Sequence, residues 1–583
     1  MNKKVNMQCS TRDMMNYASG EIAGSLIMNT LFGFAMLFYT DALGLSPVLA
    51  GIAMSVAIFW DAITDPLMGH ISDNTRSRFG RRHQYILLGG LLMVLSFLFV
   101  WTVPPVFRSS NTSLFWYLVG INMLLRTAFT MFAVPTTALG FEMCKDYDGR
   151  AKIQGLRTIF GMVANLCGPG LAWALFFPTQ GVDTKNPQNY FEMATAFSII
   201  AVLSIVYLVF TTRKYAVDSR NMKIAGSSPV AFFKDLLDIV TDYRAICVFL
   251  FAIVVILGTG LVATLQMYVY EHFMLLDGIQ KTIAHGGTMA GMVAGAALCS
   301  RFTKRFDKKG AVYAGATIGL VSALAIAALF LLKILVPGQT LGIAGFDFPV
   351  AMAIFALLGA FYYFGNGIML PVAVSMMADI SEVNELKTGI NKDGSYSAMF
   401  SLSMKVAQSI SALVVGFALA TIGFLTLGDL LESGNYAAGR IKGGEADLKI
   451  AIVAHNETAD DAAWGFVKGN GNIESNDMLQ GFIQDAGTIP ANEAVLGYLT
   501  TENIIPGTEA PAGFAESPVK APENSSVTGY MKGAYITQTP ETVLKLFIAT
   551  YIIGPIISIT ALFLIWLYPI NKEYIEKLRA GAE

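Results

Sequence analysis

The stretch from Ile58 to Tyr85 reads IFWDAITDPLMGHISDNTRSRFGRRHQY, and it limits the chain to very few folds. Its apolar beginning carries Asp61 and Asp65, which share one face of a helix because they lie four residues apart. A basic cluster follows at once, consisting of Arg76, Arg78, Arg81 and Arg82. An apolar helix that ends in arginines is typical of a membrane span that reaches the cytoplasm. Carboxylates at membrane depth need a partner, so the stretch predicts a cation site.

The composition agrees with a membrane protein. Of 583 residues, 54% are hydrophobic and 14% are charged, whereas a soluble domain carries about 25% charged residues. Long apolar runs joined by short polar links favour helices over a barrel. The net charge of -2 argues against a nucleic-acid partner, which needs a basic face. We therefore expect an integral membrane protein whose main partner is the lipid bilayer.

The apolar runs predict twelve membrane-spanning helices in an all-α fold. Their approximate extents are 21–43, 48–71, 84–104, 114–141, 155–178, 191–211, 243–272, 283–303, 311–335, 349–378, 396–425 and 543–568. Lysine and arginine concentrate in the links after the even-numbered helices, which places those links in the cytoplasm. Both chain termini are then expected to be cytoplasmic as well.

A long polar link divides the predicted helices into two bundles of six. The segments SDNTRSRFGRRHQY and SRFTKRFDKKGAVY occupy matching places in the two sets, and both are basic turns before a new helix. Repeated halves are common in secondary transporters. The expected organisation is an N-terminal bundle, a cytoplasmic linker, helices 7 to 11, an insertion, and a last helix with its cytoplasmic tail, at 1–211, 212–242, 243–425, 426–542 and 543–583.

The insertion at 426–542 is polar and rich in glycine, asparagine, proline and acidic residues. Helix parity places it outside the cytoplasm, between helices 11 and 12. Two interpretations remain open, a capping insertion without a transport role and a lid that captures substrate.

Lys405 lies inside the predicted eleventh helix, in the segment YSAMFSLSMKVAQSIS. A lysine at membrane depth must find an acid, and Asp61 and Asp65 are the best candidates. The acids and the lysine predict a switch in which a bound cation releases the lysine. A purely structural salt bridge is the alternative.

Other polar residues in the predicted helices are candidates for binding substrate. Arg126 and Arg157 can face the pore, where a guanidinium grips a hydroxyl or a carboxylate, or can bind a helix end instead. Asn366 lies between two glycines that allow close helix approach, so it is a candidate for substrate contact or for packing. Trp60 offers a flat face for a sugar ring, although membrane aromatics more often face lipid or core.

Motifs for an energy source or for catalysis are missing from the sequence. It contains no GxxxxGK[ST] segment, which makes transport driven by ATP unsupported. No HExxH, CxxC or GxSxG segment stands in a credible context either. We expect no enzyme activity and no cofactor other than a coupling ion.

Four segments together resemble one transporter family. They are WDAITDPLMG with TRSRFGRRHQYILLG, FYTDALGLSPVLAG, and MMADISEVNELKTGINKDGSYSAMFSLSMK. They are similar to the glycoside–pentoside–hexuronide:cation symporters, the melibiose-permease-like branch of the major facilitator superfamily. The resemblance covers nearly the whole chain except 426–542.

The resemblance implies roles for individual residues. Asp61 and Asp65, as ligands of Na⁺ if sodium is the coupling ion, would bind the cation with help from Thr64 and Thr130, and Lys405 matches the family's lysine on helix 11. Arg157 matches an arginine near the sugar site. Gating at the cytoplasmic end is expected of a set of charged residues, namely Arg81, Arg82, Asp379 and Glu382.

The sugar site departs from that of the melibiose permease. Its two sugar-binding acids correspond to Ser25 and Ala133 here, an aromatic residue becomes Thr137, and an arginine before the helix 2 motif becomes Ile58. Ser25 and Thr137 remain candidates for substrate contact. Loss of the acids, with arginines retained, favours an anionic sugar such as a uronide over melibiose.

The sequence thus predicts a monomeric symporter in a bacterial inner membrane. It would couple a saccharide, glycoside or uronide to Na⁺ or H⁺ by alternating access, with no nucleic-acid partner. A transporter for a lipid, drug or other organic anion is the first alternative. A receptor that senses through 426–542 is the second.

Overall fold

The computed structural model describes residues 10–75, 77, 80, 82–108, 110–143, 147–178, 184, 187–215, 242–343, 346–388, 393–424, 426, 440–442, 453–454, 462–463, 472–474, 495–500, 504–506, 527–532, 538, 540–570, 574 and 577–578. Most of the expected linker and insertion falls outside these residues, as does Arg81.

The described residues before 216, here called the N-terminal half, form helices. In chain order they are α1 (Thr11–Ala18), α2 (Glu21–Leu37), η1 (Phe38–Ala42), α3 (Pro47–Asn74), α4 (His83–Trp101), η2 (Pro105–Arg108), α5 (Asn111–Met143), α6 (Tyr147–Asn165), η3 (Leu166–Gly170), α7 (Leu171–Phe176), α8 (Pro187–Thr212) and η5 (Arg213–Tyr215). Of these, η1 and η3 are π-helical turns that continue the preceding α-helix. Pro66 and Pro135 lie inside α3 and α5, because neighbouring helices can satisfy the freed backbone groups of a membrane helix.

The described residues from 242 to 424 and from 540 to 570 form the C-terminal half. Its elements are α10 (Tyr243–Tyr268), η6 (Val269–Phe273), α11 (Gly278–Leu331), β1 (Leu341–Ile343), β2 (Phe346–Phe348), α12 (Val350–Thr388), α13 (Asp393–Ile422), α15 (Pro540–Ile548), η9 (Ala549–Ile553), α16 (Gly554–Thr560) and α17 (Leu562–Leu567). The strands β1 and β2 pair as an antiparallel hairpin between α11 and α12.

Eleven helical segments in the described part of the chain are long and apolar enough to cross a membrane, six before residue 216 and five after it. One of the five is α11, which has 54 residues and includes the two segments predicted at 283–303 and 311–335. Its backbone leaves helical geometry at Asp307 (φ 59°, ψ 175°), where two helices join across a kink. The chain is therefore a multi-pass, all-helical membrane protein.

Between α13 and α15 the described residues form short strands. These are β3 (Arg440–Lys442), β4 (Val453–Ala454), β5 (Ala462–Ala463), β6 (Asn472–Glu474), β7 (Val495–Thr500), β8 (Ile504–Pro506) and β9 (Val527–Lys532). The antiparallel pairs are β3 with β6 and β4 with β5, and β7 pairs with both β8 and β9.

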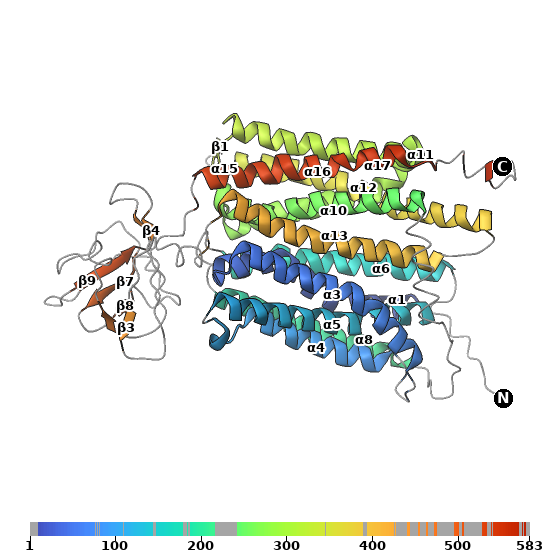
Figure 1. Ribbon diagram of the computed structural model, residues 1–583, viewed down its shortest axis with the longest axis horizontal. Coiled ribbons are helices and arrows are strands. Elements are labelled where there is room, and N and C mark those ends of the chain that lie inside the picture. Colours follow the sequence, from blue (N-terminus) through green and yellow to red (C-terminus); the bar gives the residue numbers. More distant parts are fainter. Residues whose placement is uncertain are drawn as a thin grey trace.

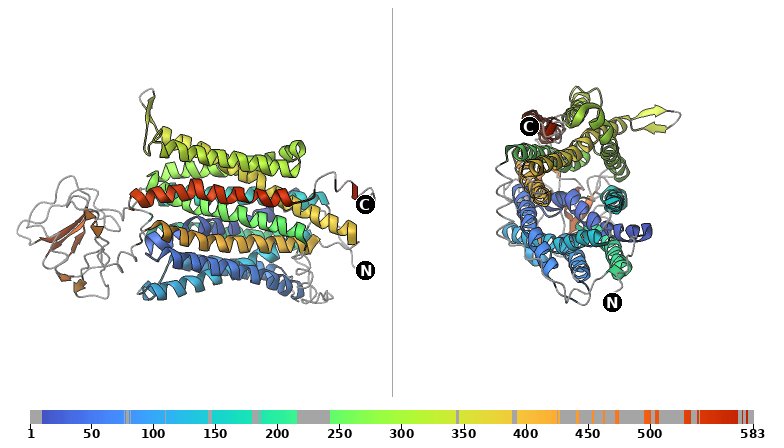
Figure 2. Two further views of the ribbon diagram at one scale, coloured as in Figure 1. Left: turned by 45° about the horizontal axis from the view of Figure 1, so that its top comes forward. Right: turned by 90° about the vertical axis from the view of Figure 1, so that its right-hand side faces the viewer.

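The long helices run roughly side by side, and the strands of 440–532 lie beyond the end of the bundle opposite to the two termini (Figure 1). Viewed along the helices, the N-terminal and C-terminal halves form two adjacent groups (Figure 2, right). Two large cores of buried apolar residues support this arrangement. One extends through the N-terminal half and into the C-terminal half, and the other lies within the C-terminal half.

Candidate functional site

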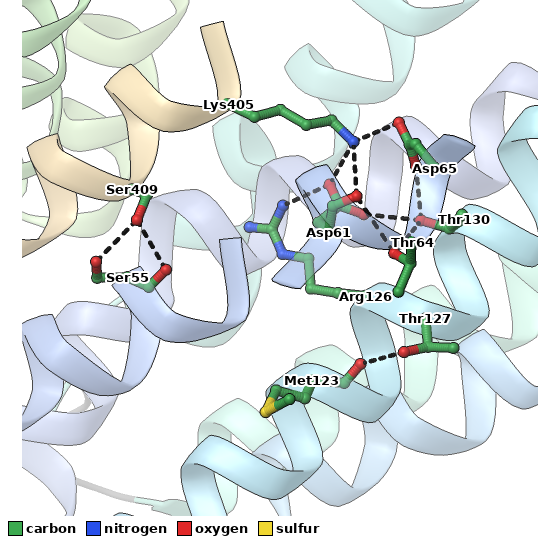
Figure 3. Close-up of polar contacts among 10 residues, drawn as sticks. All are labelled: Ser55, Asp61, Thr64, Asp65, Met123, Arg126, Thr127, Thr130, Lys405 and Ser409. Atoms are coloured by element: carbon green, nitrogen blue, oxygen red, sulfur yellow. Dashed lines mark hydrogen bonds and ion pairs between the residues drawn. The ribbon is translucent and has the colours of Figure 1, made fainter. Parts of the chain in front are cut away.

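Four charged side chains meet where α3, α5 and α13 come together, and we call Asp61, Asp65, Arg126 and Lys405 the charge cluster (Figure 3). Lys405 from the C-terminal half lies 3.0 Å from Asp61 Oδ2 and also pairs with Asp65 Oδ2. Its Nζ donates a further hydrogen bond of 3.3 Å to the Asp61 carbonyl oxygen. The lysine therefore joins the two halves through both carboxylates, as the sequence analysis expected of it.

Threonines complete the surroundings of the two acids. Thr130 Oγ1 lies 2.8 Å from Asp61 Oδ1 and 2.8 Å from Asp65 Oδ1. Thr64 donates to the Asp61 carbonyl at 3.2 Å and lies 3.3 Å from the Thr130 hydroxyl. The residues expected to bind a cation thus converge on one point, although a role in binding stays a prediction. Among the described residues, no group of three or more histidine, cysteine, aspartate or glutamate side chains could hold a metal ion.

The two acids differ in their environment. The Asp61 side chain is only 4% exposed, and Arg126 Nη1 lies 3.7 Å from its Oδ2. The Asp65 side chain is 34% exposed and has Lys405 as its cationic partner. Arg126, expected to bind substrate, is buried in this structure with its guanidinium directed at Asp61. Sequence spacing alone did not suggest this pairing, because Asp61 and Arg126 lie on different helices.

A second charged pair lies between α2 and α6. Nη2 and Nε of Arg157 contact Glu21 Oε2 at 2.8 Å and 2.9 Å. The candidates Ser25 and Thr137 join this pair, since Ser25 donates to Glu21 at 3.2 Å and Thr137 accepts from Arg157 at 3.3 Å. Glu21 was not among the residues expected to bind substrate, because it precedes the apolar run of its helix. The pattern that could have revealed Glu21 in the sequence is an acid one helical turn before Ser25, on the same helix face.

Trp60 and Asn366 lie apart from that pair. Trp60 Nε1 donates to Thr127 Oγ1 at 2.9 Å, which fixes the indole between α3 and α5. Asn366 is buried on α12 and donates to the Tyr362 carbonyl at 3.1 Å, while its Oδ1 has no partner among the described atoms. The flanking Gly365 and Gly367 approach the backbone of α11 closely. Asn366 therefore lies in a region of helix packing.

Two of the residues expected to act in gating, Arg82 and Asp379, contact partners within their own half. Arg82 donates from Nε to Glu142 at 3.0 Å and from Nη1 to Ser72 at 2.7 Å. Asp379 accepts from Lys308 at 2.6 Å. Glu382 is half-buried on α12.

At the end opposite the termini, several contacts join the halves. The Thr40 hydroxyl lies 2.8 Å from the Tyr268 hydroxyl, and His272 Nε2 lies 3.3 Å from Asp41 Oδ2. Lys281, with Glu271 as its partner, lies 4.7 Å from the ring centroid of Trp173 in the other half. These contacts close that end of the bundle.

The helices α3 and α13 also come close together. Ser55 and Ser409 lie 2.9 Å apart through their hydroxyls. An added Cβ on Gly416 would lie 2.5 Å from the Pro47 carbonyl oxygen, and one on Gly51 would lie 2.8 Å from that of Ala412. Only glycine allows backbones to approach in this way.

Comparisons with known proteins agree with this architecture. Residues 16–438 match the family described as MFS/sugar transport protein. A glucuronide carrier protein homolog of Escherichia coli is 22% identical over 423 residues, which cover 72% of this chain and 86% of that protein. An isoprimeverose transporter of Lactiplantibacillus pentosus is 20% identical over 424 residues, which cover 71% and 81% of the two chains.

A solved structure shares the fold. A mutant of the nucleoside transporter NupG aligns with a TM-score of 0.50 and 12% identity, and the alignment covers 70% of this chain and 92% of that one. At that identity the likeness concerns the fold alone. Because the family match covers more than half of the sequence, this chain belongs to the MFS/sugar transport proteins, within the glycoside–pentoside–hexuronide:cation symporters of the major facilitator superfamily.

Proposed function

We propose that this protein is a symporter that moves a saccharide, glycoside or uronide together with a coupling cation by alternating access. The observation that carries the proposal is the meeting of Lys405, from the C-terminal half, with Asp61 and Asp65 of the N-terminal half. A cation that replaces the lysine would loosen the contact between the halves. Ion binding and rearrangement of the bundle are then linked reciprocally. The names of the relatives, a glucuronide carrier protein homolog and an isoprimeverose transporter, support a sugar-like substrate.

The pair of Glu21 and Arg157, with Ser25 and Thr137, is the proposed substrate site. The guanidinium can donate hydrogen bonds to the hydroxyl groups of a sugar, and the carboxylate can accept hydrogen bonds from them. Because Glu21 already balances the charge of Arg157, the pair is suited to neutral hydroxyl groups as well as to a uronide. The retained Arg157 therefore does not by itself favour an anionic sugar over a neutral one.

We further propose that the protein crosses the inner membrane of a bacterial cell twelve times and that both of its termini lie in the cytoplasm. A straight helix as long as α11 would extend about 80 Å at about 1.5 Å per residue, far beyond a hydrocarbon core of about 30 Å. Two spans that meet at Asp307 resolve this mismatch. The even number of spans then agrees with the basic links on the cytoplasmic side.

The test is substrate-evoked ion movement in proteoliposomes that contain the full-length protein. A panel of neutral glycosides and uronides is added while Na⁺ and H⁺ are followed separately. We expect one sugar class to evoke an ion signal that disappears in Asp61→Asn and persists in Asp277→Asn, a control at an exposed helix N-cap. Full ion-stimulated uptake by Asp61→Asn would contradict the mechanism. Silence across the panel, in protein shown to be folded, would favour a cargo that is not a sugar.

A further inference from the structure

The charge cluster is balanced by the protein's own side chains. Asp61 and Asp65 contribute two negative charges, and Arg126 and Lys405 contribute two positive charges, which leaves a net charge of zero. Other groups beside the cluster in the described part of the chain do not alter this sum, since the threonines are neutral and Tyr39, near Arg126, is a phenol that is uncharged at neutral pH. A metal cation that entered the cluster while Lys405 stays in place would add an uncompensated charge.

The two basic residues differ in how easily they can leave. Lys405 has a flexible side chain and sits on α13, a helix of the opposite half, so it can withdraw when the halves move. Arg126 sits on α5 beside α3 in the same half, and it is buried. Its guanidinium keeps its charge at every accessible pH. Arg126 therefore stays beside Asp61 when Lys405 departs.

Arg126 also takes up space in the cluster and pairs with a carboxylate oxygen that a metal ion would need as a ligand. A metal ion needs several oxygens around it at once, and the available set in this cluster is the two carboxylates, Thr64, Thr130 and the Asp61 carbonyl. Arg126 already lies 3.7 Å from one oxygen of the more buried carboxylate. A sodium ion bound between the acids would thus face a fixed like charge a few ångströms away, at a depth where water screens it poorly.

We propose that Arg126 is a built-in counter-cation that makes this site unsuited to Na⁺, so that transport does not depend on sodium. The inference rests on the proposed symport function and narrows its choice of coupling ion. It assigns to Arg126 a role in ion selectivity in place of the substrate contact that the sequence suggested. The opposing reading is that Arg126 only fastens α5 to α3 and that Na⁺ binds regardless.

The experiment measures binding of radiolabelled Na⁺ to the purified full-length protein in detergent, at constant ionic strength with choline as the replacement cation. We expect no saturable binding by the unaltered protein. Arg126→Gln leaves one uncompensated negative charge, since two acids then face one lysine. That variant should gain saturable Na⁺ binding, which the unaltered protein lacks.

Three further variants make the result specific. Arg126→Lys keeps the positive charge and should remain without Na⁺ binding. The double variant Arg126→Gln with Asp65→Asn should lose the binding gained by the single one. Arg244→Gln removes an arginine that pairs with Asp242 at the start of α10, outside the cluster, and should change nothing.

Saturable Na⁺ binding by the unaltered protein that Asp65→Asn abolishes would overturn the inference, whether or not Arg126→Gln folds. Counterflow of radiolabelled methyl β-D-glucuronide and of neutral methyl glycosides in proteoliposomes separates this result from the proposed function, because counterflow needs no ion gradient. Sugar counterflow with saturable Na⁺ binding refutes the inference alone. Absence of any sugar counterflow, with the expected Na⁺ results, refutes the sugar substrate and leaves the role of Arg126 supported.

Discussion

The two halves of this transporter share features of backbone geometry at matching positions. The π-helical turns η1 and η6 begin at Phe38 and Val269, which lie 231 residues apart (269 − 38). Each is followed, at the same spacing, by a residue with positive φ, Gly44 at 70° and Leu275 at 54°. The hydrogen bond from Leu43 N to Phe38 O also has its counterpart, from Met274 N to Val269 O. The two halves thus share the geometry of this turn.

A second shared feature, a turn with a positive φ, occurs at the opposite end of the bundle. Gly80 and Asp307 both have positive φ, 83° and 59°, in the basic turns that the sequence analysis found to be similar. A basic residue after each turn then pairs with an acid on a later helix, Arg82 with Glu142 on α5 and Lys308 with Asp379 on α12. Asp41 and His272, which touch each other, are themselves 231 residues apart. Their contact therefore joins equivalent positions of the two halves.

The chemistry of the halves is not duplicated. The N-terminal half supplies Glu21, Asp61, Asp65, Arg126 and Arg157, and the C-terminal half contributes Lys405 to the same region. The C-terminal half has an ion pair, Glu271 with Lys281, that the N-terminal half lacks. The positions 231 residues earlier hold the uncharged residues Thr40 and Ala50. The halves thus resemble one another in how the backbone turns, and they differ in which side chains meet at the interface.

The largest expected effect on stability comes from breaking the fully buried ion pair of the C-terminal half, Lys281 with Glu271. The side chains of Lys281 and Glu271 are 0% and 1% exposed, so removing one partner leaves a buried, uncompensated charge. Lys281→Ala should lower the free energy of unfolding by about 3–5 kcal/mol, measured by thermal unfolding in detergent.

The double variant Glu271→Thr with Lys281→Ala copies the residues of the N-terminal half. It should recover most of that loss, because no charge remains unpaired. A double variant as unstable as the single one would mean that the two halves need different chemistry at this place.

An intermediate effect is expected where the halves touch through glycines. Gly416→Ala places a Cβ 2.5 Å from the Pro47 carbonyl oxygen and should disfavour the observed closure by about 1–3 kcal/mol. The measurement is the alkylation rate of Thr264→Cys, in a background without other cysteines, because Thr264 lines the hollow between α2, α3, α10 and α13. The rate should rise with Gly416→Ala.

Gly120→Ala is the matched control for this prediction, since a Cβ there meets nothing within 4 Å. An equal rise in the control, or no change with Gly416→Ala, would show that the contact between α3 and α13 does not hold that end closed.

The smallest effects concern the turns. Leu275 and Asp307 hold a positive φ where the N-terminal half has glycine, which is unfavourable for a residue with a Cβ. Leu275→Gly and Asp307→Gly should each stabilise the protein by about 1 kcal/mol, whereas Gly44→Ala and Gly80→Ala should destabilise it by a similar amount. Thermal unfolding of the four variants checks the pairing. Destabilisation by both glycine substitutions would mean that the halves do not share these turns.

The sequence by itself determined the membrane fold and much of the charge cluster. A lipid interior demands about 20 consecutive apolar residues per helix, so the spans are visible as runs of letters. Asp61 and Asp65 share a face because of their spacing, and Lys405 had to find an acid because lipid offers no other partner. These conclusions follow from the local chain and its solvent.

Only the tertiary structure decided which partner each remaining charge has. Arg126 meets Asp61 and Glu21 meets Arg157 because particular faces of separate helices pack together. No local pattern records that packing, since side chains far apart in the chain face each other only once the helices have associated. The same holds for Asp41 and His272, whose contact depends on the symmetric placement of two similar turns.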